Sequence, residues 1–178
     1  YRCHPAIAET CNDLFYQGKL KHGVGPSDRP ALLTGLPPVC FVDVTGKECQ
    51  KPYSKSYYNV QEITAILRLL AAVLHNAPDT ASVGVIALYK EQADRLSSGI
   101  EQLSLAQTQR SRIQISTVDA FQGSEKDVII LSCVRSDQIG FIQSPQRINV
   151  ALSRAKHHLV VFGHQPLLLK NDLWRAIL

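Results

Sequence analysis

One polar segment, STVDAFQGSEKD at residues 116–127, combines side chains that suit phosphate, ribose and nucleic-acid backbone. Gly123 permits a backbone N–H to approach a phosphate closely, and Ser116 and Thr117 can donate hydroxyl groups to a phosphate backbone. Asp119 can connect two such sites through hydrogen bonds, although it and the hydroxyl residues also suit ordinary turn or cap chemistry. A surface turn needs only Gly or Asn and solvation, so this composition predicts a ligand site.

The elements that would hold this segment alternate between strand and helix patterns. Short apolar runs rich in β-branched residues predict five strands, at residues 39–44, 82–88, 112–117, 127–134 and 157–163. Apolar residues spaced by three and four predict helices at residues 5–17, 60–74, 89–103 and 145–156, and a final amphipathic helix that contains Leu168, Leu173, Trp174 and Ile177. Strands separated mostly by helices are typical of an α/β fold, in which helices cover both faces of a parallel sheet. Ligands of such sheets bind outside the carboxyl ends of the strands, where we expect segment 116–127 to lie.

Residues at the predicted helix ends fit known capping chemistry. Pro5 suits the first position of the first helix, and Gly18 suits its end. Asn59 and Glu62 have the spacing of a capping box at the start of the second helix. Residues 19–38 and 45–56 are rich in Gly, Pro or polar side chains and predict loops.

The composition is that of an ordinary globular protein whose length suits one domain. Of 178 residues, 45% are apolar and 19% are charged, which allows a proper core. Nineteen basic and fifteen acidic residues give a net charge of +4, which fits a polyanionic partner but equally fits simple solubility. No apolar run approaches the roughly 20 residues that span a bilayer, so no membrane partner is expected.

The five cysteines predict neither a zinc site nor a disulfide framework, because no Cys-x-x-Cys pair is present. Cys3 and His4 with Cys11 have a spacing with little precedent among zinc ligands, so no metal site is expected. Reduced thiols of an intracellular protein are the better interpretation. His157 and His158 are interpreted as flanking, solvated residues rather than as ligands.

Three segments together resemble motifs of a known motor domain: Tyr1 to Pro5, Val118 to Asp127, and Asn149 to Ala155. They are similar to Q-Y-R-M-H-P, V-D-A-F-Q-G-x-E-K-D and N-V-A-L-T-R-A in the second RecA-like motor domain of superfamily 1 helicases. The matching branch contains the 5′→3′ nonsense-mediated RNA-decay helicases and their DNA-acting relatives. Residues 82–92 also resemble this branch, although Ala87-Leu88 replaces its usual Thr-Pro. The resemblance covers essentially the whole chain, looks nearest to the DNA helicases with a GRF-type zinc finger, and implies a three-layer RecA-like αβα domain.

The resemblance implies that Arg2 and Arg154 are the two arginines that contact the phosphates of ATP. Transfer of the γ-phosphate spreads negative charge that a bidentate, permanently charged guanidinium stabilises, which is the chemistry of an arginine finger. The alternatives are an ordinary terminal charge for Arg2 and a helix-surface ion pair for Arg154. By the same resemblance, Glu125 accepts hydrogen bonds from the ribose hydroxyls, or is a solvated turn acid.

Further residues are expected around the nucleotide and the nucleic acid. The resemblance implies that Tyr1 packs against the base or sugar, and that Gln122 lies between phosphate and nucleic acid. Tyr89 can stack on a base and Lys90 can neutralise a phosphate, together with the hydroxyls of Ser116 and Thr117. Tyr89 and Lys90 equally suit the first turn of a helix.

The chain contains no G-x-x-x-x-G-K-[ST] phosphate loop and no Asp-Glu pair after a strand to hold Mg²⁺. The resemblance places both in a preceding motor domain, as though residues 1–178 were cut from a longer protein. We therefore expect the second half of an ATP- and Mg²⁺-dependent 5′→3′ helicase of the nucleus, acting on single-stranded nucleic acid, with DNA favoured over RNA. The alternatives are an RNA helicase of the same branch and a non-catalytic doubly wound module that binds RNA, nucleotide or a protein.

Overall fold

The centre of the computed structural model, which describes residues 3–19, 21, 23–121 and 123–178, is a five-stranded parallel sheet. Its strands are β1 (Val39–Asp43), β4 (Val83–Ala87), β5 (Ile113–Thr117), β6 (Lys126–Ser132) and β7 (Ala155–Gly163), in the order β1–β7–β6–β4–β5. Every neighbouring pair is parallel. The strands β4, β6 and β7 lie inside the sheet and are almost entirely buried, which explains their continuous apolar sequences.

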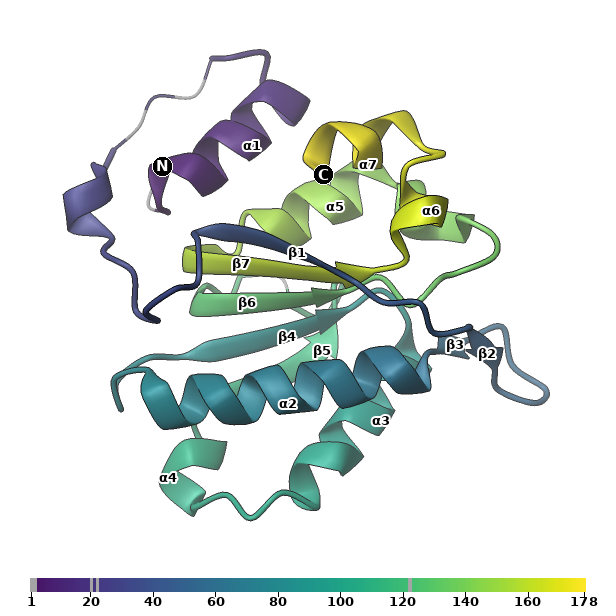
Figure 1. Cartoon of the computed structure of the whole chain (residues 1–178). Coiled ribbons are helices and arrows are strands. Elements are labelled where there is room, and N and C mark those ends of the chain that lie inside the picture. The colour runs from purple at the N-terminus through teal and green to yellow at the C-terminus, as the bar shows by residue number, and fades with distance from the viewer. Residues whose placement is uncertain (1–2, 20, 22, 122) are drawn as a thin grey trace.

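Helices cover both faces of this sheet (Figure 1). One layer contains α1 (Pro5–Phe15), α5 (Pro145–Leu152), α6 (Gln165–Leu168) and α7 (Asp172–Ile177); the other contains α2 (Val60–Asn76), α3 (Lys90–Glu101) and α4 (Gln107–Arg110). Single turns of 3₁₀ helix occur at Pro26–Asp28 and Gly140–Gln143. Each layer buries its own apolar cluster against the sheet, one around Trp174 and Ile148 and the other around Ile66 and Leu96. The predicted α/β fold with a covered parallel sheet is therefore confirmed.

Two helix starts show how local sequence sets the element boundaries. Pro5 is in the first turn of α1 and the ring of His4 accepts a hydrogen bond from the backbone N–H of Ala6, so the predicted start is confirmed. At α2, Asn59 accepts from the N–H of Glu62, but the Glu62 carboxylate does not reach back to Asn59. The predicted capping box is wrong, because that carboxylate instead accepts hydrogen bonds from Ser132, the last residue of β6, and from Val134 just beyond it.

Three elements near the chain's polar segments differ from the predictions. The helix predicted to reach residue 156 ends at Leu152, because the backbone that follows it hydrogen-bonds to the sheet. The N–H of Lys126 donates to the carbonyl of Arg154 over 3.0 Å. The predicted final helix is two short helices, α6 and α7, with Asn171 capping the second. The predicted loop at residues 45–56 contains half of a hairpin formed by β2 (Cys49–Gln50) and β3 (Tyr57–Tyr58).

The connection from β5 to β6 crosses the sheet, and its described residues, 118–121 and 123–125, form no helix. Thr117 is level with Ala87 at the carboxyl end of β4, whereas Lys126 is level with Ala155 at the amino end of β7. Residues 118–125 therefore run back along the whole length of the sheet. Val118 and Phe121 are buried beneath the α1–α5 layer, and a Cβ at Gly84 would lie 2.5 Å from the ring of Phe121. Gly84 thus gives this connection room to lie directly on β4.

Candidate nucleotide and nucleic-acid site

The predicted site residues lie at two opposite edges of the sheet. Glu125 immediately precedes β6 and Arg154 immediately precedes β7, so both are at the amino edge. Thr117 ends β5 and Lys90 follows β4, so both are at the carboxyl edge. The expectation that the whole polar segment lies at the carboxyl edge is wrong, because residues 118–125 carry the chain from one edge to the other.

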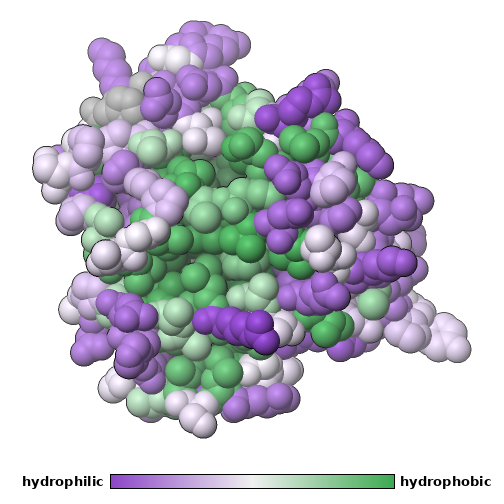
Figure 2. Space-filling view, in the orientation of Figure 1, coloured by the Kyte–Doolittle hydropathy of each residue, from purple (hydrophilic) through white to green (hydrophobic). Residues whose placement is uncertain are grey.

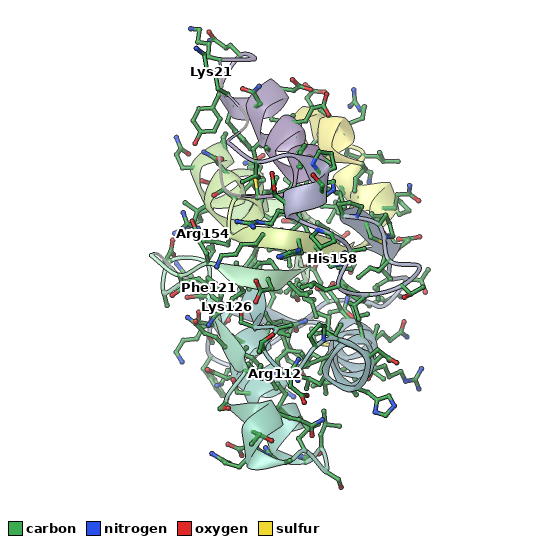
Figure 3. The ribbon with its side chains drawn as sticks, turned by 90° about the vertical axis from the view of Figure 1, so that its left-hand side faces the viewer. Lys21, Arg112, Phe121, Lys126, Arg154 and His158 are labelled. Atoms are coloured by element: carbon green, nitrogen blue, oxygen red, sulfur yellow. The ribbon has the colours of Figure 1, made fainter. Side chains whose placement is uncertain are left out.

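At the amino edge, backbone hydrogen bonds bring three distant segments together. The Lys126 N–H donates to the Arg154 carbonyl, and the His4 N–H donates to the Lys156 carbonyl over 2.7 Å. Figure 3 looks onto this edge and shows Arg154 and Lys126 at the starts of neighbouring strands. Tyr1, Arg2 and Gln122, which were predicted to share this site, lie outside the described residues.

The Cys3 thiol shows how near the first segment lies to the turn. The pKa of Cys3 is raised to about 11, chiefly by burial; the negative charge of Glu125 contributes to this rise, and the positive charge of Arg29 opposes it. Glu125 itself is exposed and makes no hydrogen bond with any described residue. No side chain in the described part of the chain therefore competes with a ligand for this carboxylate.

Arg154 presents most of its guanidinium to this edge. The side chain is half-buried, and among the described residues its one hydrogen bond runs from Nε to the carbonyl of Val150 over 3.2 Å. No carboxylate in the described part of the chain forms an ion pair with it, so the alternative of a helix-surface ion pair does not fit. The two terminal nitrogens remain available to bind an anion in the bidentate manner of arginine.

The helix that leads to Arg154 is fixed on both sides. Ile148, Ala151 and Leu152 of α5 are buried, and the Asn149 side chain donates to the hydroxyl of Tyr16 just beyond α1. The chain leaves this rigid helix only two residues before β7 begins. Arg154 is therefore held between a packed helix and a sheet hydrogen bond, which limits the positions that its side chain can reach.

Gly123 gives the turn an open backbone. Its φ of +79° lies in the left-handed region that Gly adopts readily, and a Cβ at this position would meet nothing within 4 Å. The residue is exposed. The backbone conformation therefore explains why Gly stands here, and a phosphate can approach the backbone without steric hindrance.

At the carboxyl edge the predicted residues differ in accessibility. Lys90 is exposed and pairs with Asp94 one helical turn later, over 3.0 Å, and Thr117 is half-exposed at the strand end. The hydroxyl of Ser116 is buried and has no hydrogen-bond partner among the described residues, so it does not face an external phosphate. Tyr89 is only 3% exposed, and its ring lacks a free face for a base in this conformation. The roles predicted for Ser116 and Tyr89 do not fit the structure.

Tyr89 instead belongs to a buried ionic cluster that the sequence did not predict. Arg135, 6% exposed, donates to both oxygens of Glu48 and to the Tyr89 hydroxyl, and lies 4.0 Å from the ring centre of Tyr57. Burial of Glu48 opposes ionisation, but hydrogen bonds from Arg135 and from backbone N–H groups lower its pKa below the ordinary value. The sequence separation of 87 between Glu48 and Arg135 explains why no local pattern indicated this pair.

A second buried polar cluster fixes the exit of β6. The fully buried Glu62 carboxylate accepts hydrogen bonds from the Ser132 hydroxyl and the Val134 N–H, and Gln92 donates to the same hydroxyl. Burial raises the pKa of Glu62 to about 7, although these hydrogen bonds oppose the rise. Val134 has a φ of +72°, which is rare for a β-branched residue. The cluster thus holds a strained backbone in place directly before Arg135.

One ion pair links the connection between β5 and β6 to α5, the helix before Arg154. Arg147 on α5 donates two hydrogen bonds of 3.1 Å to the two oxygens of Asp119. A small hollow of about 120 Å³ lies beside this pair, lined partly by Val118 and Val150. Arg147 is in the first turn of α5, and the helix runs from there toward Arg154, so this pair joins Asp119 to the helix that leads to the amino edge.

His158 differs from its interpretation as a solvated residue. It is buried within β7; its Nε2 accepts from the Leu32 N–H over 2.9 Å, and its Nδ1 lies 3.1 Å from the Pro37 carbonyl. Burial lowers the pKa of His158, which favours the neutral ring that these two contacts require. His157 lies 2.9 Å from the Pro30 carbonyl. Both histidines therefore anchor the loop before β1, and Figure 3 shows His158 on the sheet.

Two properties of the described residues concern metal ions and membranes. Among the described residues, no three His, Cys, Asp or Glu side chains are grouped so that they could hold a metal ion. None of the helices that the structure describes is long and apolar enough to cross a membrane.

A comparison with models of protein families identifies the family of this chain. A family model described as an AAA domain matches residues 1–166. The chain belongs to this family. This family membership agrees with the resemblance carried by residues 118–127 and 149–155. Those segments place the carboxylate of Glu125 and the guanidinium of Arg154 at one edge of the sheet.

Individual relatives extend the similarity to the whole chain. The mouse protein named 5'-3' DNA helicase ZGRF1 is 43% identical over 178 residues, which are 100% of this chain and 10% of that protein. Helicase SEN1 of Saccharomyces cerevisiae and a regulator of nonsense transcripts 1 homolog of Arabidopsis thaliana are each 36% identical over 100% of this chain, and 8% and 15% of their own lengths. The chain thus spans a small fraction of these relatives.

A solved structure supports the fold of this AAA domain. The C-terminal domain of a "possible DNA helicase" from Lactobacillus plantarum superposes with a TM-score of 0.56 and 15% sequence identity. The match covers 100% of this chain and 94% of the other. At this identity the comparison shows a shared RecA-like αβα fold, in agreement with the prediction.

Proposed function

We propose that residues 1–178 form a single RecA-like domain, the second motor domain of an ATP-dependent 5′→3′ helicase. The observation that carries this proposal is the half-buried Arg154 guanidinium, which has no ion-pair partner among the described residues and lies at the same edge as Glu125. A guanidinium held there without a carboxylate suits an anion supplied by another molecule or domain. The similarity to helicases along the full chain supports ATP as that anion.

In this proposal the nucleotide lies between two motor domains. The first motor domain supplies the Mg²⁺ ligands and the phosphate loop, whose motif the sequence of residues 1–178 does not contain. The present chain supplies Arg2 and Arg154 to the phosphates, the Gly123 backbone and Gln122 near them, Glu125 to the ribose hydroxyls, and Tyr1 to the base or sugar. Arg154 acts most strongly while charge develops on the γ-phosphate.

Single-stranded nucleic acid occupies the opposite, carboxyl edge. The exposed ammonium of Lys90 and the accessible strand end at Thr117 support this placement, and the net charge of +4 is compatible with it. We favour DNA over RNA because the identity with the mouse protein named a DNA helicase, 43%, exceeds the 36% found for the yeast and Arabidopsis relatives. A nuclear location follows from a DNA substrate, and the five free cysteines agree with a reducing compartment.

Strand displacement by the full-length protein tests the proposal. We expect ATPase activity that single-stranded DNA stimulates more than single-stranded RNA, and unwinding of a duplex with a 5′ overhang but not of one with a 3′ overhang. Absence of any nucleic-acid-stimulated ATPase, together with absence of a phosphate loop in the sequence before Tyr1, would favour the non-catalytic binding module instead.

A further inference from the structure

The β2–β3 hairpin has a rigid stem that rests on the carboxyl edge of the sheet. The Ser56 hydroxyl accepts from the Glu91 N–H at the start of α3, the Tyr57 ring packs edge-on against Tyr89, and the Arg95 guanidinium lies 3.6 Å from the ring centre of Tyr58. These contacts fix the stem to α3 beside Lys90. The hairpin therefore projects from a defined position rather than from a free loop.

The tip of this hairpin presents an aromatic ring to solvent. Tyr53 is the most exposed large hydrophobic residue in the described part of the chain, at 111%, and its φ of +58° places a non-glycine residue in the left-handed region. Backbone bonds within the tip, such as Ser54 N–H to the Lys51 carbonyl, hold this turn. Figures 1 and 2 show the hairpin as a lobe that projects beyond the carboxyl ends of the strands.

The charge around the ring is positive. Residues 50–55 contain Lys51 and Lys55 and no acid, and together they line a hollow of about 380 Å³. Lys51 is 2.7 Å from Glu91, whereas Lys55 forms no ion pair with any described residue. An exposed ring beside an unpaired ammonium suits a ligand that carries both flat apolar faces and negative charge.

We infer that the hairpin is an additional contact for single-stranded nucleic acid, in which Tyr53 stacks on a base and Lys55 binds a neighbouring phosphate. This inference rests on the proposed function, because it takes its ligand from the helicase substrate. Bases present flat faces whatever their sequence, and a strand that leaves Thr117 and Lys90 at the carboxyl edge meets the hairpin next. The contact is thus independent of base identity and extends the nucleic-acid path beyond the sheet.

Substitutions of Tyr53 and of Lys55 should change the affinity for nucleic acid, and its salt dependence, in different ways. We expect Tyr53→Ala to weaken binding of a fluorescent oligothymidylate by roughly 5- to 100-fold, the range for loss of one stacked base, and Tyr53→Phe to retain affinity because the hydroxyl is not needed. Lys55→Ala should lower the slope of log affinity against log salt by about 0.7, the value for one phosphate on a single strand. Tyr53→Ala should leave that slope unchanged.

The experiment uses fluorescence anisotropy on the full-length protein. Lys19→Ala is the control, because Lys19 is exposed and follows α1, whose helix layer covers the face of the sheet opposite α3. Photo-cross-linking of an oligonucleotide that contains 5-iodouracil should modify Tyr53. If the wild type binds no single-stranded nucleic acid, the proposed function itself fails. If the wild type binds but Tyr53→Ala binds equally well and Tyr53 is not cross-linked, only the hairpin inference fails, and the tip is then assigned to a protein contact.

Discussion

Replacement of Arg154 by Ala removes a guanidinium that makes few contacts with the rest of the domain. The side chain makes one hydrogen bond among the described residues, from Nε to the Val150 carbonyl, and the bond between the Arg154 carbonyl and Lys126 N–H survives the substitution. We therefore expect the free energy of unfolding to fall by about 1 kcal/mol at most, the typical contribution of one such hydrogen bond. The effect on catalysis should be much larger.

The catalytic effect follows from when the guanidinium is needed. An arginine finger stabilises charge that develops only during phosphoryl transfer and contributes about 10³- to 10⁵-fold in rate. We expect kcat of the full-length protein to fall at least about 100-fold, or about 2.7 kcal/mol, while KM for ATP changes little. Arg154→Lys should restore little activity, because an ammonium cannot form the bidentate contact.

The assay is steady-state ATP hydrolysis at saturating oligothymidylate, with thermal unfolding and nucleic-acid binding measured on the same samples. Arg175→Ala is the matched control, because Arg175 Nε also donates to a backbone carbonyl, that of Leu169, but lies on α7 away from the amino edge. Binding of single-stranded DNA without nucleotide should remain nearly normal for both variants. If Arg154→Ala keeps its stimulated ATPase, or loses it only because the domain unfolds, Arg154 is structural and the finger assignment is wrong.

Three further predictions concern other parts of the molecule. The purified 178-residue chain should hydrolyse no ATP above background with or without DNA, since it lacks a phosphate loop, and turnover in a clean sample would contradict the two-domain proposal. The pKa of Glu62 rises from 4.5 to about 7 on folding, so its protonated form stabilises the fold below pH 4.5 and this stabilisation, about 3 kcal/mol, is lost as the pH rises through 7. Denaturant unfolding of the wild type relative to Glu62→Gln from pH 4.5 to 8 should show this difference, and a pH-independent difference would refute the assigned role of burial. Asp119→Ala breaks the exposed pair with Arg147, so the free energy of unfolding should change by only about 0–1 kcal/mol. The ratio of DNA-stimulated to basal ATPase should fall. An unchanged ratio would exclude Asp119 from the coupling between nucleic-acid binding and ATP hydrolysis.

The sheet was predictable because its strands are buried on both faces. Parallel strands covered by helices need apolar side chains at every position, and this produced runs such as residues 82–88 and 127–134 whose bounds fall within two residues of β4 and β6. Residues 45–56 lack such a run. The hairpin there has strands of two residues each, and ring contacts from α3 stabilise its stem, so no local pattern could predict it.

The end of α5 was not predictable for a related reason. The sequence from Pro145 to Lys156 keeps helical spacing, but the backbone from Ala155 onward pairs with Lys126 on β6. Long-range sheet pairing thus overrides the local preference. The same limit applies to Arg135 and Glu48, whose pairing depends on chain segments far apart in sequence, and to His158, whose partners lie in the loop before β1.

The path of residues 116–127 explains why one short segment carries two kinds of chemistry. Its first residues, Thr117 and Asp119, lie at or near the edge proposed for nucleic acid, and its last residues, Gly123 and Glu125, lie at the edge proposed for nucleotide. Buried Val118 and Phe121 hold the segment against the sheet between these ends. We therefore expect a displacement at one edge to reach the other through the buried side chains of Val118 and Phe121, and through the Asp119–Arg147 pair along α5 to Arg154.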